Sequence, residues 1–398
     1  MWMKLWKKNY ELNKDVERFT VGKDYILDKN LIKYDCIASI AHVKMLGKVG
    51  MLKPAEVKRL GLELNKIIEL DKKGLFKIKR EDEDCHTAIE NHLTKRLGDV
   101  GKKVHTARSR NDQSLTALRL YYREELESTK ALVNELISSI TEFKVEYGRV
   151  QLPGYTHTRK AMPSSVALWS DAFIDSMKDN LKVLEFVSVL VNQSPLGSGA
   201  GYGVPIKIDR EYTARELGFE KAQSNPIYVQ NSRGKFELAI VQALGQVMLD
   251  LNKIASDLII FSMPEFGYFI LPKKFLTGSS MMPHKNNPDV LEILRANYHV
   301  VDSYSFRISG IISNLISGYN RDVQLTKEPM MDSFEIAETS LRIASLLFKE
   351  MKVDREKCDK AMTRELFATE ETYKLVEKGV PFREAYKQVS DKFSDQSR

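Results

Sequence analysis

Four segments of this chain repeat apolar side chains at steps of three and four residues, the spacing that places them on one face of a helix. In the segment from Gln113 to Phe143 the repeat is formed by Leu115, Leu118, Tyr122, Leu126, Val133, Ile137 and Ile140. Similar repeats cover residues 164–192, 235–261 and 289–317. Average helices have about 11–12 residues, and longer amphipathic helices are stable mainly through packing of the apolar face. We therefore expect an all-α fold around a long central helical bundle.

Glycine and proline mark the loops between these helices, at Pro153–Gly154, from Pro195 to Pro205 and from Pro264 to Pro288. Strand signals are few and short, for example at Lys77–Lys79. We expect three parts: an N-terminal helical domain at 1–105, the central bundle at 106–353 and a C-terminal helical domain at 354–398.

Composition excludes several other classes of protein. No apolar stretch approaches the roughly 18 residues that span a bilayer, so no membrane is expected. The three cysteines, Cys36, Cys85 and Cys358, are far apart, which favours a reducing cytoplasm over a disulfide framework. The net charge is +7, but acidic and basic residues alternate without a long basic block. We expect no nucleic acid and a locally positive pocket for an anionic substrate.

The segment from Thr277 to Pro288 is rich in serine, asparagine and proline, a composition typical of an exposed loop. Its order, Gly-Ser-Ser-x-Met-Pro-x-Lys-x-Asn-Pro, resembles the signature of the superfamily that contains fumarase, aspartase, adenylosuccinate lyase and argininosuccinate lyase. These enzymes remove a proton next to a carboxylate and expel an amine or hydroxyl from the neighbouring carbon, which gives fumarate. By this resemblance Ser279 is the catalytic base.

The chemistry of this elimination explains the other residues of the loop. Proton removal leaves an aci-carboxylate with two negative charges, and fixed donors must stabilise it. Backbone N–H groups, Lys285 and the Asn287 amide are the donors here. A serine acts as a base only as an alkoxide, stabilised by the same positive surroundings and shielded from water. We therefore expect the loop to close over the substrate.

The segment Pro153–His157 precedes one of the apolar helices, and we expect it to open that helix. A lone histidine after a turn is most often structural. The string resembles the superfamily's PGYTH motif, whose histidine bonds to a glutamate that falls here at Glu292, seven residues after Lys285. Such a pair can carry out acid–base chemistry near neutral pH. The resemblance gives His157 and Glu292 as catalytic and Thr156 as a carboxylate ligand, without identifying the general acid.

The segment His105–Gln113, HTARSRNDQ, places Asn111 and Asp112 where N-cap residues of the following helix are expected. A helix N-terminus beside arginine is a ready carboxylate site. The string resembles HTGRSRNDQ, which within the superfamily is specific to argininosuccinate lyases. It implies that Ser109, Arg110 and Asn111 contact the succinate part of the substrate.

Two further segments resemble ligand-bearing stretches of the same family. Residues 84–90 match the D-x-H-x-A-x-E part of E-D-x-H-x-A-x-E, and residues 319–327 match YN-[KR]-D-x-Q-x-x-K. By resemblance the second segment binds the succinate or arginine end of the substrate. The implied substrate ligands are Asp84, His86, Tyr319, Gln324 and Lys327.

Neither a metal nor a dinucleotide is expected. Asp82, Asp84, Cys85 and His86 offer ligand atoms, but His86 and His92 do not have the i,i+4 spacing of a helical zinc site. The run 195–203, PLGSGAGYG, fits neither GxGxxG nor GxSxG. It resembles the PLGxGA loop of the lyases, which shapes the backbone near the site.

The resemblance implies reversible elimination of arginine from argininosuccinate to give fumarate, without a cofactor. It also implies a homotetramer in which each active site is formed by three subunits. One contributes residues 84–90 and 105–113, another residues 153–163 and the third the loop 277–292. One alternative is an adenylosuccinate lyase or another fumarate-forming lyase, which shares the GSSxMP loop but lacks SRNDQ. The other is a catalytically silent relative, like the lens crystallins built on this fold.

The chain departs from the family pattern at several positions. A family serine that contacts substrate falls at Asp24, whereas Asp28 matches the aspartate four positions on. The family's WGGRF is Trp6–Tyr10 here, and its third domain is matched only at its start, by residues 379–385. A natural short form and a shortened chain both fit that match. The remaining departures are Ala107 for a glycine and Arg159 and Met162 for glutamines.

Overall fold

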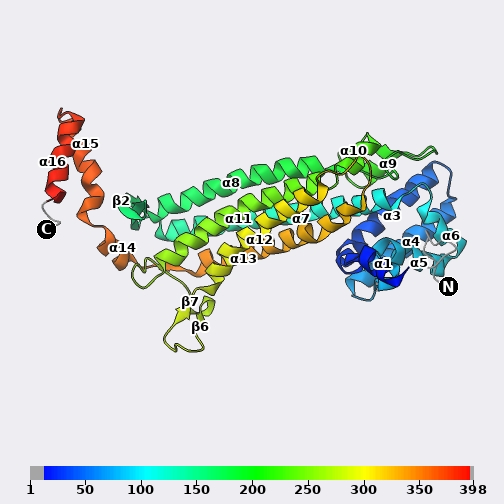
Figure 1. The fold of residues 1–398 in the computed structure, drawn as a ribbon, viewed down its shortest axis with the longest axis horizontal. Coiled ribbons are helices and arrows are strands. Elements are labelled where there is room, and N and C mark those ends of the chain that lie inside the picture. The colour runs from blue at the N-terminus through cyan, green and yellow to red at the C-terminus, as the bar shows by residue number, and fades with distance from the viewer. Residues whose placement is uncertain (1–12, 395–398) are drawn as a thin grey trace. The chain divides into compact units, whose positions relative to one another are not determined.

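The computed structural model describes residues 13–394, and most of these residues are helical (Figure 1). The all-α prediction is confirmed. The segment Trp6–Tyr10, which departs from the family's WGGRF, lies outside the described residues. The four predicted long helices are present, and a fifth follows them in sequence. Their bounds are α7 Arg110–Tyr147, α8 Val166–Val191, α11 Lys235–Phe261, α12 Asp289–Ile312 and α13 Lys327–Glu350.

The described residues form two compact units, each built from three separate stretches of sequence. The first unit lies within residues 1–128, 184–243 and 302–334, and the second within 129–183, 244–301 and 335–398. The stretches of the two units therefore alternate along the chain.

In the second unit, parts of the five long helices pack side by side as a bundle. Polar pairs link each neighbour to the next: Lys144–Asp171 joins α7 to α8, Trp169–Asp257 joins α8 to α11, Asn252–Arg295 joins α11 to α12, Asn297–Ser340 joins α12 to α13, and Lys349–Glu135 joins α13 to α7. Aromatic rings of Phe143, Trp169, Phe269 and Phe348 fill one end of its core. The bundle thus closes on itself around an apolar interior.

Helix α11 is apolar and long enough to cross a membrane by composition alone. Its apolar stripe is instead covered by the protein, because Ile240, Leu244, Val247, Leu251, Ile254 and Leu258 are fully buried. Burial of this stripe is the main hydrophobic stabilisation of a long helix. We identify α11 as a core helix.

The segment Pro153–His157 forms part of a β-hairpin, so the expectation that it opens a helix is wrong. Strand β1 (Gln151–Thr156) pairs antiparallel with β2 (Arg159–Ser165), and His157 and Thr158 form the turn with φ of +51° and +57°. Two successive positive φ angles are typical of the turn that matches strand twist in hairpins. The helix that follows, α8, begins only at Val166.

The strand expected at Lys77–Lys79, in the first unit, is absent, because residues 75–79 run without a partner strand among the described residues.

Other short elements complete the second unit. The second unit has two further two-stranded pairs and three short helices: β5 Phe269–Ile270 with β8 Lys352–Val353, β6 Thr277–Gly278 with β7 Asn286–Asn287, and α14 Arg355–Ala361, α15 Ala368–Glu377 and α16 Phe382–Ser394.

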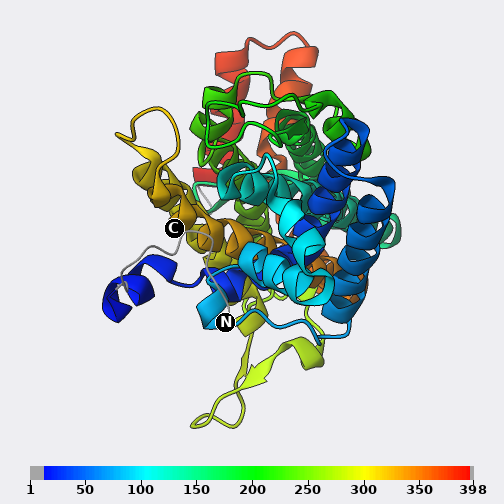
Figure 2. The same ribbon diagram turned by 90° about the vertical axis from the view of Figure 1, so that its right-hand side faces the viewer.

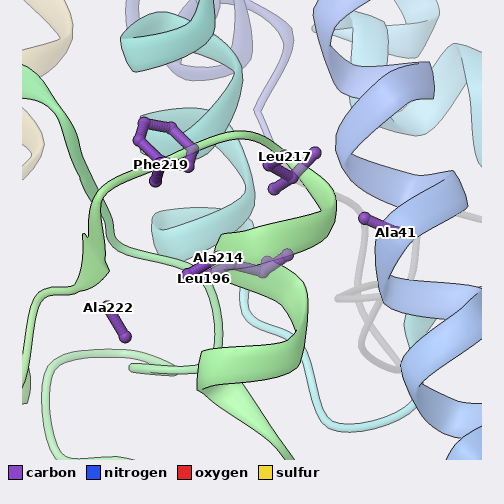
Figure 3. Packing of buried hydrophobic residues seen from close by; sticks show 6 residues of the cluster. All are labelled: Ala41, Leu196, Ala214, Leu217, Phe219 and Ala222. Atoms are coloured by element: carbon purple, nitrogen blue, oxygen red, sulfur yellow. The ribbon is translucent and has the colours of Figure 1, made fainter.

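The first unit packs short helices around the start of α7. Figure 3 shows one buried cluster, formed by Ala41 of α3 together with Leu196, Ala214, Leu217, Phe219 and Ala222. This cluster anchors the glycine-rich run 195–203 against the helical core. The other α-helices and strands of the first unit are α1 Lys14–Val21, α2 Asp24–Leu27, α3 Ile32–Lys48, α4 Pro54–Lys72, α5 Cys85–Leu97, α6 Asp99–Lys102, α9 Arg210–Glu216, α10 Pro226–Asn231 and the pair β3 Gln193–Ser194 with β4 Lys221–Ala222.

Candidate active site

The serine loop is carried by the β6–β7 hairpin of the second unit. Both views of the ribbon show this hairpin extending away from the bundle (Figures 1 and 2). Thr277 pairs with Asn287 in the hairpin, and Ser279 follows β6 directly. The Ser279 Oγ accepts hydrogen bonds from the backbone N–H groups of Met281, at 3.3 Å, and Met282, at 3.1 Å. The Ser279 hydroxyl is thus held by its own loop. Lys285, in the same loop, is exposed to solvent.

His157 and Glu292 are not brought together within the chain. His157 lies in the β1–β2 turn and Glu292 in the first turn of α12, and both side chains are exposed. Among the described residues no hydrogen bond joins them. Thr156, the last residue of β1, is exposed as well. These predicted residues therefore face outward from the second unit.

The first unit contains a polar pocket of about 160 Å³. Seven of the predicted substrate ligands line it: Asp84, His86, Arg110, Asn111, Tyr319, Gln324 and Lys327. Tyr319, Gln324 and Lys327 lie more than 200 positions after Asn111, so the fold brings distant residues together here. The pocket also contains residues that were not predicted as ligands: Asp24, Asp28, Ser114, Arg233 and Arg321.

The start of α7 fixes the position of the SRND segment. The helix begins at Arg110, so Ser109 occupies the N-cap position that was expected for Asn111 and Asp112. The Ser109 hydroxyl accepts from the Asn111 N–H at 3.2 Å, and the Asp112 carboxylate accepts from the Ser109 N–H at 3.0 Å. This reciprocal arrangement satisfies N–H groups that a helix start leaves free.

Asp112 also binds the glycine-rich loop. Its second oxygen accepts from the backbone N–H groups of Gly197, at 3.0 Å, and Gly199, at 2.8 Å. Burial raises the pKa of Asp112 to about 6, although the hydrogen bonds from Gly199, Ser109 and Gly197 lower it. The carboxylate of Asp112 thus joins the glycine-rich loop to the start of α7.

Lys327 is buried between two carboxylates at the pocket. Its Nζ lies 2.6 Å from Asp28 Oδ1 and 3.1 Å from Asp24 Oδ1. Burial alone would lower the pKa of Lys327, but the two carboxylates outweigh burial and hold it above the usual value. Lys327 therefore carries a positive charge that is shared between two acids.

The pKa of His86 is raised by a residue that the sequence did not indicate. Its Nδ1 lies 3.2 Å from the buried Asp35 carboxylate, which also accepts from Gln113 Nε2 at 2.9 Å. Burial would lower the pKa of His86, yet Asp35 outweighs this and raises it. Nothing in the local sequence marks Asp35, which stands among the apolar residues of α3.

The other cations of the pocket differ in how they are paired. Arg110 lies 3.5 Å from both Glu83 and Asp84 and contacts the Thr87 hydroxyl. Arg233 stacks over the Tyr319 ring, with 5.2 Å between guanidinium carbon and ring centroid. Arg233 was not predicted, because no motif in the sequence includes it.

Asp28, Cys85 and His86 bring three possible metal-ligating atoms close together. The two oxygens of Asp28 are already bound, one to Lys327 and the other to the Cys85 N–H. Burial raises the pKa of the Cys85 thiol well above its usual value, so the thiolate needed for metal binding is disfavoured. We assign no metal to this cluster.

A mixed-charge pocket at the start of a long helix, together with a serine loop on an all-α bundle, defines a lyase of the fumarase/aspartase fold. The structure of EDDS lyase in complex with formate matches 96% of this chain and 76% of its own at a TM-score of 0.83 and 22% identity. Class II fumarase from Schistosoma mansoni matches 95% of this chain and 93% of its own at a TM-score of 0.79 and 16% identity. At these identities the likeness concerns the fold.

Sequence comparison identifies the family. The model of the family described as "Lyase" matches residues 9–301. An argininosuccinate lyase from Thermotoga neapolitana is 53% identical over 390 residues, with 98% of each chain covered. Another, from Phocaeicola vulgatus, is 41% identical over 389 residues, which are 98% of this chain and 87% of that one. The chain belongs to the argininosuccinate lyase family.

Proposed function

We propose that this chain catalyses the reversible elimination of arginine from argininosuccinate to give fumarate, in arginine biosynthesis. The observation that supports it most strongly is the pocket of the first unit, which gathers the SRN segment and the 319–327 segment. Its arginine, lysine, amide and hydroxyl groups suit a small molecule with several carboxylates.

The serine loop supplies the base in this proposal. Ser279 removes the proton from the carbon next to a carboxylate, and the elimination expels arginine from the neighbouring carbon. Lys285 and the Asn287 amide stabilise the doubly charged aci-carboxylate, because fixed donors aimed at developing charge lower the barrier. Thr156 binds a substrate carboxylate, and the His157–Glu292 pair orients a ligand or transfers a proton.

We further propose that the active enzyme is a homotetramer with active sites shared between subunits. The exposure of His157 and Glu292 supports this, since neither has its expected partner within the chain. Large apolar side chains on α8 and α12 also support an assembly, because Leu168, Phe186, Ile293 and Phe306 are between 62% and 82% exposed.

The chain contains free cysteines at Cys36, Cys85 and Cys358, all of them buried. Free thiols fit a reducing compartment, and we propose the cytoplasm. No cofactor enters the proposed reaction, since serine, lysine and amide groups supply its chemistry.

One assay with four substrates tests the proposed function. Fumarate release is followed by its ultraviolet absorbance with argininosuccinate, adenylosuccinate, aspartate and malate in turn. We expect release from argininosuccinate alone. Turnover of adenylosuccinate without argininosuccinate would overturn the assignment, and no turnover by a folded tetramer would favour a catalytically silent relative.

A further inference from the structure

The tip of the β1–β2 hairpin carries two of the residues proposed for the elimination, Thr156 and His157. Both side chains are exposed, and within the turn the Thr158 hydroxyl donates to the His157 carbonyl oxygen at 2.6 Å. A two-stranded hairpin is only marginally stable in water by itself. Because a displacement of about 1 Å at a catalytic group can lower turnover by about 10², the contacts that anchor this hairpin below its tip matter for the chemistry.

One anchor lies on the strand that carries Thr156. The hydroxyl of Tyr155, the preceding residue, lies 2.8 Å from the hydroxyl of Tyr268, at hydrogen-bond distance. The two rings share their aromatic neighbours, since each ring centroid lies within 6.3 Å of those of both Phe261 and Phe266. Such packing would also hold a phenylalanine, so the two hydroxyls add a contact of defined direction.

Tyr268 is itself held in a fixed place. It is 4% exposed, and the next residue, Phe269, pairs with Val353 of β8. The Tyr268 carbonyl oxygen accepts from the N–H of Asp354, the N-cap of α14, at 2.9 Å. Burial raises the pKa of the Tyr268 phenol, and the hydrogen bond with Tyr155 raises it further, so the hydroxyl stays protonated. It therefore offers the hairpin a buried and well-placed partner.

A second anchor holds the opposite strand. Lys160 of β2 is the register partner of Tyr155, and this pair lies one position before the last pair of the hairpin. The Lys160 Nζ donates to the carbonyl oxygen of Ala361, at 2.8 Å, and to Thr363 Oγ1, at 2.9 Å. Both strands are thus tied just below the tip. Without the bond between the two tyrosines, this directional anchoring would be left to the lysine strand.

We propose that Tyr268 is a positioning residue for the elimination, because its hydroxyl bonds to Tyr155 and so fixes the orientation of Thr156 and His157. In this role Tyr268 does not contact the substrate and acts through the hairpin. The inference rests on the proposed function, which assigns a carboxylate ligand and an acid–base group to the hairpin tip. Tyr268 stands 113 positions from Tyr155, so no motif that covers the hairpin could include it.

The test begins with Tyr268→Phe, which removes the hydroxyl, keeps the aromatic packing and should fold. Assayed with argininosuccinate well below its thermal midpoint, the variant should lose about tenfold in kcat, because a loosened tip adopts the productive geometry less often. Tyr155→Phe removes the same bond from its other end and should cause a similar loss. The double variant should be no slower than the slower single variant, because one shared interaction can be lost only once.

Amide hydrogen exchange, followed by mass spectrometry, is a second readout that does not depend on turnover. Peptides within residues 151–165 should exchange up to about tenfold faster in Tyr268→Phe than in the wild type. Tyr147→Phe is the matched control, because it removes the hydroxyl of another buried tyrosine of the second unit, on α7. It should leave both readouts at their wild-type values.

A folded Tyr268→Phe enzyme with the wild-type kcat, or with a hairpin that exchanges no faster, overturns the inference. A lower thermal midpoint without a lower kcat has the same meaning, since the bond would then be structural alone. A double variant much slower than either single variant also overturns it, because the two hydroxyls would act separately. If the wild type turns over none of the four assay substrates, the proposed function fails, and amide exchange alone decides whether Tyr268 orders the hairpin.

Discussion

Single buried side chains decide how the ligand segments of this protein are held. Asp112 is fully buried and accepts backbone hydrogen bonds from Ser109, Gly197 and Gly199. Asp35 has a comparable role for His86, whose ring it holds through Nδ1. Neither acid lines the pocket. Asp35 holds His86, which does, and Asp112 joins the start of α7 to the loop 195–203. Both are positioning residues.

The Asp112 carboxylate offers a direct test of this role. Asp112→Ala should destabilise the fold by about 2–5 kcal/mol, because it leaves buried N–H groups of Gly197 and Gly199 without an acceptor. Asp112→Asn keeps an acceptor oxygen and should cost less. Urea unfolding monitored by circular dichroism measures the order. An Ala variant as stable as the wild type would contradict the role.

Ser279 tests the proposed chemistry. Ser279→Ala should leave the thermal midpoint nearly unchanged, because the side chain bonds only to its own exposed loop among the described residues. Turnover should fall by about 10²–10⁴ through loss of the proton acceptor. Ser280→Ala is the matched control, with a much smaller loss expected. A Ser279→Ala enzyme that retained over about a tenth of the activity would exclude Ser279 as the base.

His42 makes the fold sensitive to acid. Burial lowers its pKa to about 3, helped by the nearby Arg108, and its Nε2 lies 2.8 Å from the Thr106 carbonyl oxygen. The unfolded chain takes up a proton near pH 6.5, whereas the folded chain does so only near pH 3. The stability due to neutral His42 is therefore complete above about pH 6.5 and declines as the pH falls toward 3.

His42→Gln removes this titration and keeps a donor for the carbonyl. Between pH 7 and pH 4.5 the wild type should lose about 2–3 kcal/mol more stability than the variant does. Urea unfolding at the two pH values gives the comparison. Equal losses in both proteins would show that His42 is not the acid-sensitive group.

The ligand motifs were sufficient to predict most of the first-unit pocket. Arg110, Asn111 and Tyr319 belong to strings whose order is distinctive, so resemblance located them. Arg233 and Asp35 could not be located in this way, because their roles arise from packing between distant segments. The roles of Ser279, His157 and Glu292 stay predictions.

At the scale of elements, long apolar repeats predicted helices well and short polar segments poorly. Four long helices were predicted from their repeats, whereas α13 was not, although Met330, Phe334, Ala337, Leu341 and Ala344 repeat at its buried face. Its first residue, Lys327, is the last residue of the polar 319–327 motif. The β1–β2 hairpin was also missed, because its strands depend on each other and carry no apolar alternation.

The turn of this hairpin contains a strained residue. Thr158 adopts φ of +57°, which costs a β-branched residue roughly 1–2 kcal/mol. Thr158→Gly should therefore raise the thermal midpoint or leave it unchanged, despite the greater entropy of an unfolded glycine. Differential scanning calorimetry measures the effect. Thr20→Gly, inside helix α1, is a control that should destabilise.

At the scale of the whole molecule, the residues of the proposed site divide between the two units. The substrate ligands of the first unit form a pocket, and the serine loop and His157 belong to the second. If the site is shared between subunits, an inactive His157→Asn protein and an inactive Arg110→Gln protein should complement each other.

Mixing the two variants after mild dissociation should restore part of the wild-type turnover through hybrid tetramers. Each variant put through the same procedure alone is the control. Analytical ultracentrifugation should show tetramers before and after mixing. A fully active monomer, or an absence of restored activity in verified hybrids, would contradict shared sites.

The interleaved order of the two units has a consequence for synthesis on the ribosome. The first unit cannot be completed until residues 302–334 have been translated, late in a chain of 398 residues. Until then α7 and α8 have left the ribosome without α13, and their apolar faces lack a final partner. Such nascent chains are prone to aggregate. We expect production of this protein to depend on chaperones that hold the emerging helices apart until residues 302–334 have been synthesised.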